Sequence, residues 1–368
     1  MAAPMIIRRL DVAPLEIALR EPFGISGGAL KAANNVLVTV ELVDGTRGFG
    51  EAAPFPAYNG ETQGGALAAL RNARDWIPWR DAGDWRAIGA EFRARSGAGC
   101  GAALCALETA LLDAVTRRDR MPLWRHFGGA GTELETDMTV TTGSPAAAAA
   151  AARDIRRRGI RIIKVKVGGS GVMEFDLMRL DAIRDAAPES PLILDGNAGL
   201  SRADASELVR GLRRLGITPV LLEQWLPRDD LAGMRALGEE TGWTVAADES
   251  VASVADARLV ASERAAQVVN IKLMKAGVAE ALAIAAVARD SGLGLMIGGN
   301  VESILAMTVS ACFAAGLGGF AFADLDTPLF LADNPFTGGY ALEGGRISVA
   351  HIEAGHGVAP SRANLPSE

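Results

Sequence analysis

Short apolar runs alternate with helical patterns along the C-terminal two-thirds of this chain. From residue 137 onward, runs rich in Val, Ile and Leu are typical of buried parallel strands, and each stretch between them can hold one helix. The predicted strands lie near residues 137–141, 162–167, 191–195, 219–223, 244–248, 268–272, 294–298 and 320–324. Eight strands with seven intervening helices favour a (β/α) barrel over an open sheet.

The first 131 residues follow another pattern, which predicts a separate α+β domain. Residues 5 to about 43 alternate as strands do, and helical patterns follow near 61–79, 84–95 and 101–118. Stretches rich in Gly, Pro and Asn are expected to form two long loops, at residues 21–34 and 50–62. The predicted organisation is therefore a capping domain (1–131), a barrel (132–328) and a glycine-rich segment (329–368) that returns to the capping domain.

Length and charge narrow the class of protein. The 368 residues suffice for a barrel of roughly 250 residues and a further domain of about 100. A net charge of −7 argues against nucleic acid or an anionic membrane as a partner. No apolar run is long enough to span a membrane or to resemble a signal peptide, so a cytoplasmic location is expected. The three cysteines are expected to fill helix faces as small apolar residues, and no histidine falls at a strand end.

Charged side chains recur at one end of the predicted barrel strands. Successive strands end 24 to 29 residues apart, and the last interval of 52 residues covers two strands. The residues are Lys164, Lys166, Asp195, Glu223, Asp248, Lys272 and Asp324. A lone charge at a strand end is most often a helix cap, but these converge on the face where barrels of parallel strands build active sites. Converging like charges destabilise a fold unless a cation or a substrate compensates them.

Three successive strands present carboxylates, at Asp195, Glu223 and Asp248. Oxygen ligands of this kind suit one Mg²⁺, with positions left open for substrate oxygens. Asn197 lies on the same face as Asp195 and is expected to contact the metal ligands without binding the metal itself. The alternative is a ring of salt bridges between these acids and the lysines.

The lysines are predicted to act as acids and bases. Lys164 and Lys166 are two residues apart, so both point into the barrel, and their repulsion of about 2.5 kcal/mol is expected to lower a lysine pKa toward neutral pH. Lys272 comes from the strand on the far side of the acids. A base on each side of one carbon can remove a proton from one face and return it to the other, which inverts a stereocentre.

Asp324 and Asp326 share a face in the segment ADLDTP, beyond the acids that are predicted to bind metal. Two carboxylates without a metal suit a substrate ammonium group. A role in helix capping or in a turn is the alternative.

These motifs resemble the enolase superfamily, in its muconate lactonizing enzyme subgroup, and most closely the dipeptide epimerases. The matching segments are KVKVG at Lys164, DGNAG at Asp195, EQWLP at Glu223, ADES at Asp248 and NIKLMKAG at Lys272. The resemblance implies a modified (β/α)₇β barrel with an α+β cap whose loops near Phe23 and Tyr58 close over the substrate. It also implies proton transfer by lysine beside Mg²⁺, a chemistry already known for that superfamily. By the same resemblance, Thr139 and the segment Gly298 to Asn300 line the pocket.

The resemblance also bears on the substrate. The Asp324 and Asp326 pair is similar to the one that binds the α-ammonium group in dipeptide epimerases, which implies inversion at the second residue of an L,L-dipeptide. Epimerases for Ala-Glu carry an arginine in the first cap loop, where this chain has PFGISGGAL, so hydrophobic side chains are expected. The expected partner is thus a small molecule, a dipeptide, and the sequence leaves open whether copies of the chain form a homo-oligomer.

Other functions stay open from the sequence. An N-acylamino acid racemase or an o-succinylbenzoate synthase of the same subgroup would act on substrates without an ammonium group. A metal-dependent binding protein would use the lysines only as anion ligands. A Schiff-base aldolase would use Lys166 or Lys272 as a nucleophile, but it leaves the three acids without a role.

Overall fold

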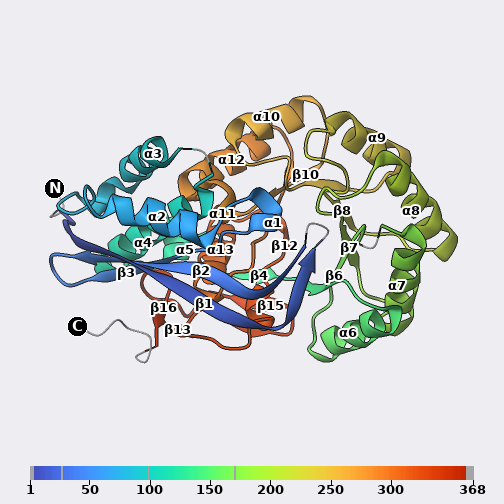
Figure 1. Cartoon of the computed structure of the whole chain (residues 1–368), viewed down its shortest axis with the longest axis horizontal. Coiled ribbons are helices and arrows are strands. Elements are labelled where there is room, and N and C mark those ends of the chain that lie inside the picture. Colours follow the sequence, from blue (N-terminus) through green and yellow to red (C-terminus); the bar gives the residue numbers. More distant parts are fainter. Residues whose placement is uncertain (1–3, 26–27, 98, 170, 362–368) are drawn as a thin grey trace.

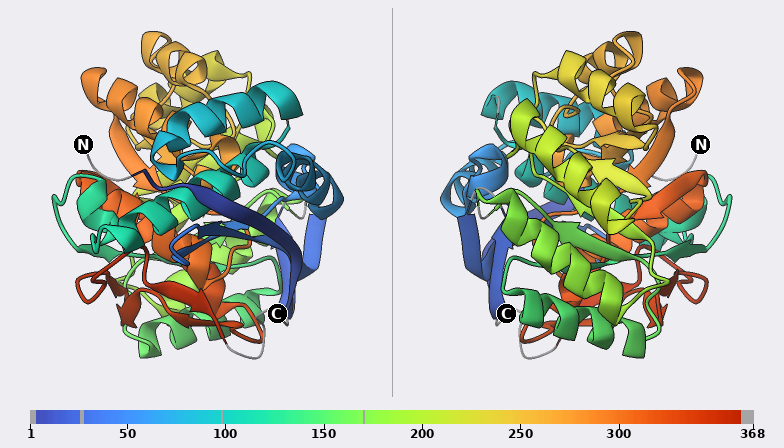
Figure 2. Two further views of the ribbon diagram at one scale, coloured as in Figure 1. Left: turned by 90° about the vertical axis from the view of Figure 1, so that its left-hand side faces the viewer. Right: turned by 90° about the vertical axis from the view of Figure 1, so that its right-hand side faces the viewer.

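An antiparallel sheet with helices on one side and a curled parallel sheet inside a ring of helices make up the protein (Figure 1). The computed structural model describes residues 4–25, 28–97, 99–169 and 171–361, and for residues 22–25 and 28–30 it describes the backbone alone. Figure 2 shows the barrel helices packed around the outside of the parallel strands. Among the described residues, no helix has the length and apolar content needed to cross a membrane.

The capping domain starts with three antiparallel strands in the order β1-β2-β3. They are β1 (Ile7–Ile25), β2 (Gly28–Leu42) and β3 (Arg47–Ala52), followed by helices α1 (Pro56–Asn59), α2 (Gln63–Ala73), α3 (Trp85–Ser96), α4 (Gly101–Arg118) and α5 (Leu123–His126). Helix α4 is buried along most of its length and packs directly on β3. Gly48 and Gly50 permit this contact, because a Cβ atom at either position would collide with the backbone of α4.

The first predicted loop is wrong for most of its length. Strands β1 and β2 continue through it as a long hairpin, with Phe23 opposite Leu30 and Ile25 opposite Gly28. Glycine content suggested a loop, yet backbone pairing needs no large side chains once the neighbouring strands are in register. The hairpin reaches from the capping domain toward the barrel strands (Figure 1). The side chains of the segment PFGISGGAL, residues 22–30, on which the expected preference for hydrophobic substrates is based, lie outside the described residues.

The barrel contains the eight predicted strands, all parallel, in the order β5 to β12. They are β5 (Met138–Val140), β6 (Ile163–Lys166), β7 (Leu192–Asp195), β8 (Leu221–Glu223), β9 (Val245–Ala247), β10 (Val268–Ile271), β11 (Gly294–Ile297) and β12 (Phe320–Ala323). The backbone N–H of Asp137 donates to the carbonyl of Ala323 at 3.0 Å, so the first and last strands meet at a seam. This is the predicted modified barrel with a capping domain.

Helices alternate with these strands and cover their outer face (Figure 1). They are α6 (Pro145–Arg157), α7 (Met173–Ala186), α8 (Arg202–Leu215), α9 (Leu231–Thr241), α10 (Val254–Ser262), the single turn α11 (Leu273–Ala276), α12 (Val278–Asp290) and α13 (Ile304–Leu317). Several begin at a side-chain cap: Ser201, for example, accepts from Asp204 N–H and starts α8 with a capping box. Cys105 and Cys312 are buried in α4 and α13 as free thiols, as expected for small apolar residues.

The C-terminal segment contacts both parts of the protein. Its strands are β13 (Phe336–Gly338), β14 (Ala341–Glu343), β15 (Arg346–Ser348) and β16 (Val358–Pro360). β15 pairs with β4 (Glu133–Glu135), the short strand before the barrel, whereas His356 is buried against Asp113 of α4. The segment thus joins the entry of the barrel to the capping domain.

Candidate active site

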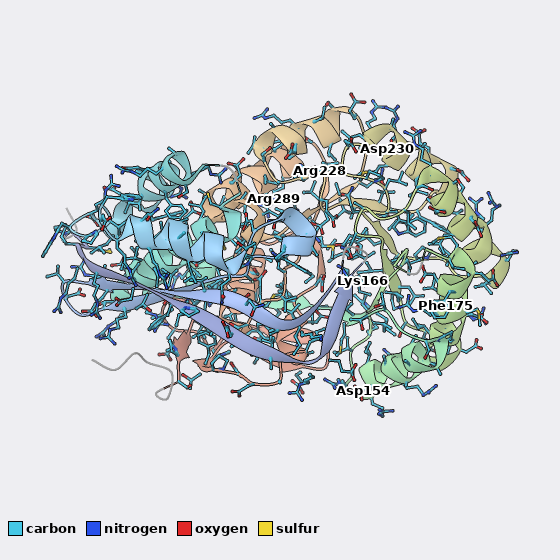
Figure 3. All side chains as sticks on the ribbon, viewed as in Figure 1. Asp154, Lys166, Phe175, Arg228, Asp230 and Arg289 are labelled. Carbon is cyan, nitrogen blue, oxygen red and sulfur yellow. The ribbon has the colours of Figure 1, made fainter. Side chains whose placement is uncertain are left out.

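The carboxyl ends of the barrel strands bring the predicted charged residues together. Strand register places Lys166 opposite Asp195 and Asp195 opposite Glu223. Asp248, Lys272 and Asp324 each directly follow the end of a strand. All of these side chains and Lys164 are 8% exposed or less. Figure 3 shows Lys166 at the centre of the molecule, near the end of the hairpin formed by β1 and β2.

Lys164 lies at the centre of this group. Its Nζ atom is 3.0 Å from Asp195 Oδ2, 2.8 Å from Glu223 Oε2 and 2.6 Å from Asp324 Oδ2. Burial alone would lower the pKa of Lys164, but these carboxylates raise it well above its ordinary value. The expectation that repulsion from Lys166 lowers this pKa is therefore wrong, because the sequence does not reveal how closely the acids surround the amine.

The two outer lysines each contact one acid. Lys166 Nζ is 2.6 Å from Asp195 Oδ2, and Lys272 Nζ is 2.7 Å from Asp248 Oδ2. Burial opposes the charge of Lys272, yet the neighbouring Asp248 raises its pKa above the ordinary range. Asp195 and Asp248 lie on strands between those of Lys166 and Lys272, and each of these acids contacts the lysine nearer to it.

Further residues that the sequence did not single out hold these acids in place. Lys275, on α11, donates to Asp248 Oδ1 at 3.0 Å and to its carbonyl at 2.8 Å. Asn270 donates to Glu223 Oε1 at 2.9 Å. The predicted supporting residue Asn197 donates its backbone N–H to Asp195 Oδ1 at 2.9 Å.

The scarcity of lysine in the chain is a feature of the sequence that points to Lys275 as a functional residue. The chain has five lysines among 37 basic residues, and four of them are at the strand ends or on the turn that follows. Arginine is almost never deprotonated, whereas lysine can gain and lose a proton, so lysine is kept where an amine must react or fit a compact site. The fifth, Lys31, is exposed on β2.

A small cavity of about 20 Å³ lies above the acids. Lys166 and Lys272 line it together with Asp324, Asp326 and Thr139, so the predicted bases and the predicted ammonium site share one chamber. Asn300 also lines it and donates to Ala53 O of the capping domain at 3.0 Å.

Two predicted pocket residues lie outside this chamber. Lys164 is fully buried below it. Gly298 packs on Asn270 instead, since a Cβ at Gly298 would lie 2.9 Å from Asn270 Oδ1, and the chamber is lined by Gly299. Gly298 therefore lets the backbone approach the residue that supports Glu223.

Asp326 faces the chamber with one free carboxylate oxygen. Its Oδ2 atom accepts from Thr139 N–H at 2.7 Å, while Oδ1 is buried and has no hydrogen-bond partner among the described residues. Burial and the charge of Asp324 raise the pKa of Asp326 to about 7. This oxygen is available to a hydrogen-bond donor that enters the chamber.

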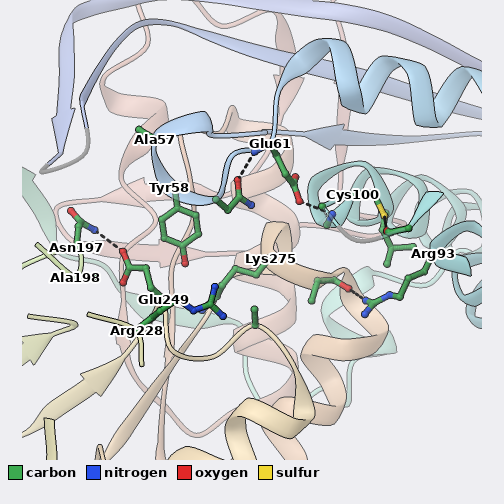
Figure 4. Close-up of a pocket in the computed structure, with 17 residues that line it drawn as sticks. Ala57, Tyr58, Glu61, Arg93, Cys100, Asn197, Ala198, Arg228, Glu249 and Lys275 are labelled. Atoms are coloured by element: carbon green, nitrogen blue, oxygen red, sulfur yellow. Dashed lines mark hydrogen bonds between the residues drawn. The ribbon is translucent and has the colours of Figure 1, made fainter. Parts of the chain in front are cut away.

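Tyr58 separates the chamber from a larger cavity of about 420 Å³ between the capping domain and the barrel. Its hydroxyl donates to Asp248 Oδ1 at 2.9 Å, and Lys272 Nζ lies 4.5 Å from the centre of its ring. Figure 4 shows Tyr58 projecting from α1 toward Glu249 and Lys275. One aromatic side chain thus contacts a predicted metal ligand and a predicted base.

Two of the three predicted metal ligands, Asp195 and Glu223, lie close enough together to share a cation. Oxygens of Asp195 and Glu223 already share one cation, the Lys164 ammonium, so they are close enough to be bridged. Asp248 Oδ2 and Glu223 Oε2 are both buried, and each contacts a lysine ammonium, Lys272 at 2.7 Å and Lys164 at 2.8 Å, so both oxygens lie where a cation binds. A donor set made only of carboxylate oxygens is the one that Mg²⁺ prefers.

Comparison with known proteins agrees with this geometry. Residues 8–128 match the N-terminal domain of mandelate racemase and muconate lactonizing enzyme, and residues 146–364 match the enolase C-terminal domain-like family. The chain belongs to the enolase superfamily. Within it, the relatives described next, several of which are dipeptide epimerases, place the protein in the muconate lactonizing enzyme subgroup.

Several relatives in this superfamily are similar over nearly their whole length. An aromatic dipeptide epimerase of Herpetosiphon aurantiacus is 50% identical over 355 residues, which cover 96% of this chain and 99% of the relative. A mandelate racemase/muconate lactonizing enzyme of Roseiflexus sp. is 56% identical, with a TM-score of 0.92 and coverage of 98% and 99%. The dipeptide epimerase of Enterococcus faecalis in complex with Mg and L-Leu-L-Tyr is 30% identical, with a TM-score of 0.91 and coverage of 96% and 100%.

Proposed function

We propose that this protein is a dipeptide epimerase that uses one Mg²⁺ to invert the α-carbon of the second residue of an L,L-dipeptide. The observation that carries the proposal is the shared chamber, in which two lysines and a pair of aspartates face the same small space. The similarity to an aromatic and to other dipeptide epimerases supports the substrate class. Dipeptides with hydrophobic side chains are the preferred substrates in this proposal.

Each group has one role. Asp195, Glu223 and Asp248 hold the metal, which neutralises negative charge on the substrate carboxylate. Lys166 takes the α-proton from one face of the carbon and Lys272 delivers a proton to the other face, or the reverse. Lys164 lies beneath the acids and keeps positive charge near the carboxylate as the α-carbon loses its proton. Asp324 and Asp326 bind the α-ammonium group and so fix the distance from the amino terminus to the reacting carbon.

The test is a library of L,L-dipeptides incubated with the protein and Mg²⁺ in D₂O. Epimerisation replaces the α-proton of the second residue with deuterium, so substrates gain one mass unit and the L,D form accumulates. Mass shifts across the library also report the preferred side chains. No mass shift in any dipeptide, together with a shift in N-acylamino acids, would move the protein to the N-acylamino acid racemases.

Replacing Asp326 with asparagine is predicted to weaken dipeptide turnover by raising KM. Losing a buried carboxylate partner of an ammonium group costs about 3 kcal/mol, or roughly a hundredfold in kcat/KM. Asp326→Asn is the cleaner variant, because Asp324 also contacts Lys164 at 2.6 Å. Steady-state kinetics measure the effect, and unchanged kcat/KM would favour a substrate without an ammonium group.

The same carboxyl predicts a dependence of KM on pH. The pKa of Asp326 is raised to about 7, so this group is neutral below that pH and ionised above it. Only the ionised form attracts an ammonium group, so KM for dipeptides is expected to fall as the pH rises through about 7. In Asp326→Asn this change should be smaller, and an equal change in the variant would assign it to another group.

Replacing Tyr58 with phenylalanine is predicted to tighten Mg²⁺ binding. The hydroxyl occupies a lone pair of Asp248 at 2.9 Å, and a hydrogen bond to a charged group contributes about 1.5 kcal/mol, or roughly tenfold in affinity. The ring remains, so its contact with Lys272 is kept. Calorimetry with Mg²⁺ measures the change. Tyr340→Phe is the matched control, because Tyr340 donates to Leu325 O, away from Asp248; weaker binding in Tyr58→Phe alone would show that the phenol supports the ligand instead.

A further inference from the structure

Asp137 is a buried carboxyl that the proposed reaction leaves unused. It directly precedes β5, its exposed fraction is 0%, and neither of its oxygens has a hydrogen-bond partner among the described residues. Since side chains two residues apart along a strand share a face, Asp137 lies on the side of Thr139, which binds Asp326. The unused carboxyl is therefore directed toward the proposed ammonium site.

Asp137, Asp324 and Asp326 form a single cluster. One carboxylate oxygen from each lies within 4.8 Å of the others, and all three residues are buried. The Lys164 ammonium contacts Asp324, and in the described ranges no cation contacts Asp137 or Asp326. Three ionised carboxylates beside one ammonium would leave two uncompensated negative charges in a buried site, which is a large cost in free energy.

A shared proton resolves this cost while the site is empty. Carboxyl groups so close together do not all ionise near neutral pH, because each charge raises the pKa of the next. Burial and the nearby Asp324 raise the pKa of Asp137 well above its ordinary value, while Lys164 opposes the shift; Asp326 and Glu223 raise it further. Burial and its acidic neighbours thus favour a proton on Asp137 while the site is empty.

We propose that Asp137 is the third carboxyl of the ammonium site, which carries a proton while the site is empty and loses it when an ammonium group binds at Asp324 and Asp326. The inference rests on the proposed function in taking the substrate's α-ammonium group as the incoming cation. One positive charge enters and one proton leaves, so the net charge of the cluster is unchanged. The only bond that breaks is the O–H bond of Asp137. Asp326 faces the chamber and Asp137 does not, so the proton passes by way of Asp326 into the chamber and from there to solvent.

This exchange gives the site a means of selection. A ligand with a neutral amide at this end brings no positive charge, so it cannot replace the proton. The negative charge of the cluster stays balanced by that proton, and the ligand gains no ionic partner. A ligand with an ammonium group replaces the proton and gains two ionised partners. Dipeptide binding is therefore linked to proton release near neutral pH.

Calorimetry on the Mg²⁺-loaded protein tests the linkage. The probe is L-Leu-Gly, whose second α-carbon is not a stereocentre, so that proton transfer there produces no new compound. Titrations in PIPES and in HEPES, which carry no primary ammonium group and bind Mg²⁺ weakly, give the number of protons released at one near-neutral pH, because the two buffers differ in their heat of protonation. The wild type is expected to release about one proton per ligand bound from Asp137, in addition to the fraction of a proton that Asp326, with a pKa of about 7, releases at this pH. Asp137→Asn, which keeps the shape and a neutral group, is expected to bind within about threefold of the wild type and to release less than half as much.

Asp113→Asn is the matched control, because Asp113 is equally buried but lies in α4 against His356. It should release as many protons as the wild type. The proposal is overturned if Asp137→Asn releases as many protons as the wild type, if the wild type releases none, or if a folded Asp137→Asn binds more than about tenfold more weakly.

Deuterium uptake at the glycine methylene of the same probe separates this inference from the proposed function. Uptake in D₂O without proton release would overturn the role of Asp137 and keep the epimerase. A wild type that neither binds nor exchanges the probe would overturn both.

Discussion

Replacing either Lys166 or Lys272 with alanine is expected to abolish inversion. Exchange of the α-hydrogen with solvent should continue in one of the two diastereomers, either the L,L or the L,D dipeptide. Each lysine serves one face of the α-carbon, so the remaining lysine still removes and returns the proton on its own side. Inversion should fall by at least about 10³-fold, since a positioned acid or base contributes up to about 10⁴-fold. NMR of the L,L and L,D dipeptides in D₂O should find exchange in opposite diastereomers for the two variants.

Lys31→Ala is the control for the loss of a lysine, because Lys31 is exposed on β2 and is the one lysine outside the strand ends and α11. It should invert dipeptides at the rate of the wild type. Exchange in the same diastereomer for both Lys166→Ala and Lys272→Ala would place the two amines on one face of the carbon. Inactivation by borohydride with substrate present would instead indicate a Schiff base.

Removing one acid of the predicted metal site is expected to have a comparable effect. Asp195→Asn, Glu223→Gln and Asp248→Asn each delete one negative charge from a buried site and remove a carboxylate that contacts a lysine. Each variant also removes one of three charged oxygen ligands predicted for the cation, so Mg²⁺ affinity should fall by roughly a hundredfold, or about 3 kcal/mol. Turnover at low Mg²⁺ should fall with it, and chelation of the wild type should abolish turnover reversibly.

Calorimetry with Mg²⁺ measures the affinity, and Asp113→Asn serves again as a buried aspartate far from the strand ends. This control is expected to lose stability and to keep its Mg²⁺ affinity. A variant such as Asp248→Asn that binds Mg²⁺ as tightly as the wild type would remove that residue from the metal site.

The sequence predicted the barrel well because its strands are short, apolar and evenly spaced. The run around Lys164, expected at 162–167, is observed as Ile163–Lys166, and the strand that ends at Asp195 differs by one residue at its start. Both faces of a parallel strand are buried, so the apolar run and the strand nearly coincide. Charges that end such runs then lie together at one end of the barrel.

The same approach failed where function depends on distance and charge balance. Asp137 was predicted only as the first residue of a strand, because its proximity to Asp324 arises from closure of the barrel at the seam. The pKa of Lys164 was predicted in the wrong direction, since three carboxylates around one amine are contributed by strands far apart in the sequence. Tyr58 was placed in a cap loop, but its contact with Asp248 depends on how the two domains pack.

The central claim is that a dipeptide binds with its second α-carbon between Lys166 and Lys272 and its amino terminus at Asp324 and Asp326. Incubation of the wild type and Mg²⁺ with an active L,L-dipeptide in D₂O, followed by ¹H NMR of both residues, tests it most directly. Deuterium is expected at the α-carbon of the second residue alone, in an equilibrium mixture of L,L and L,D forms. Deuterium at the first residue, or inversion without incorporation of solvent deuterium, would contradict the account.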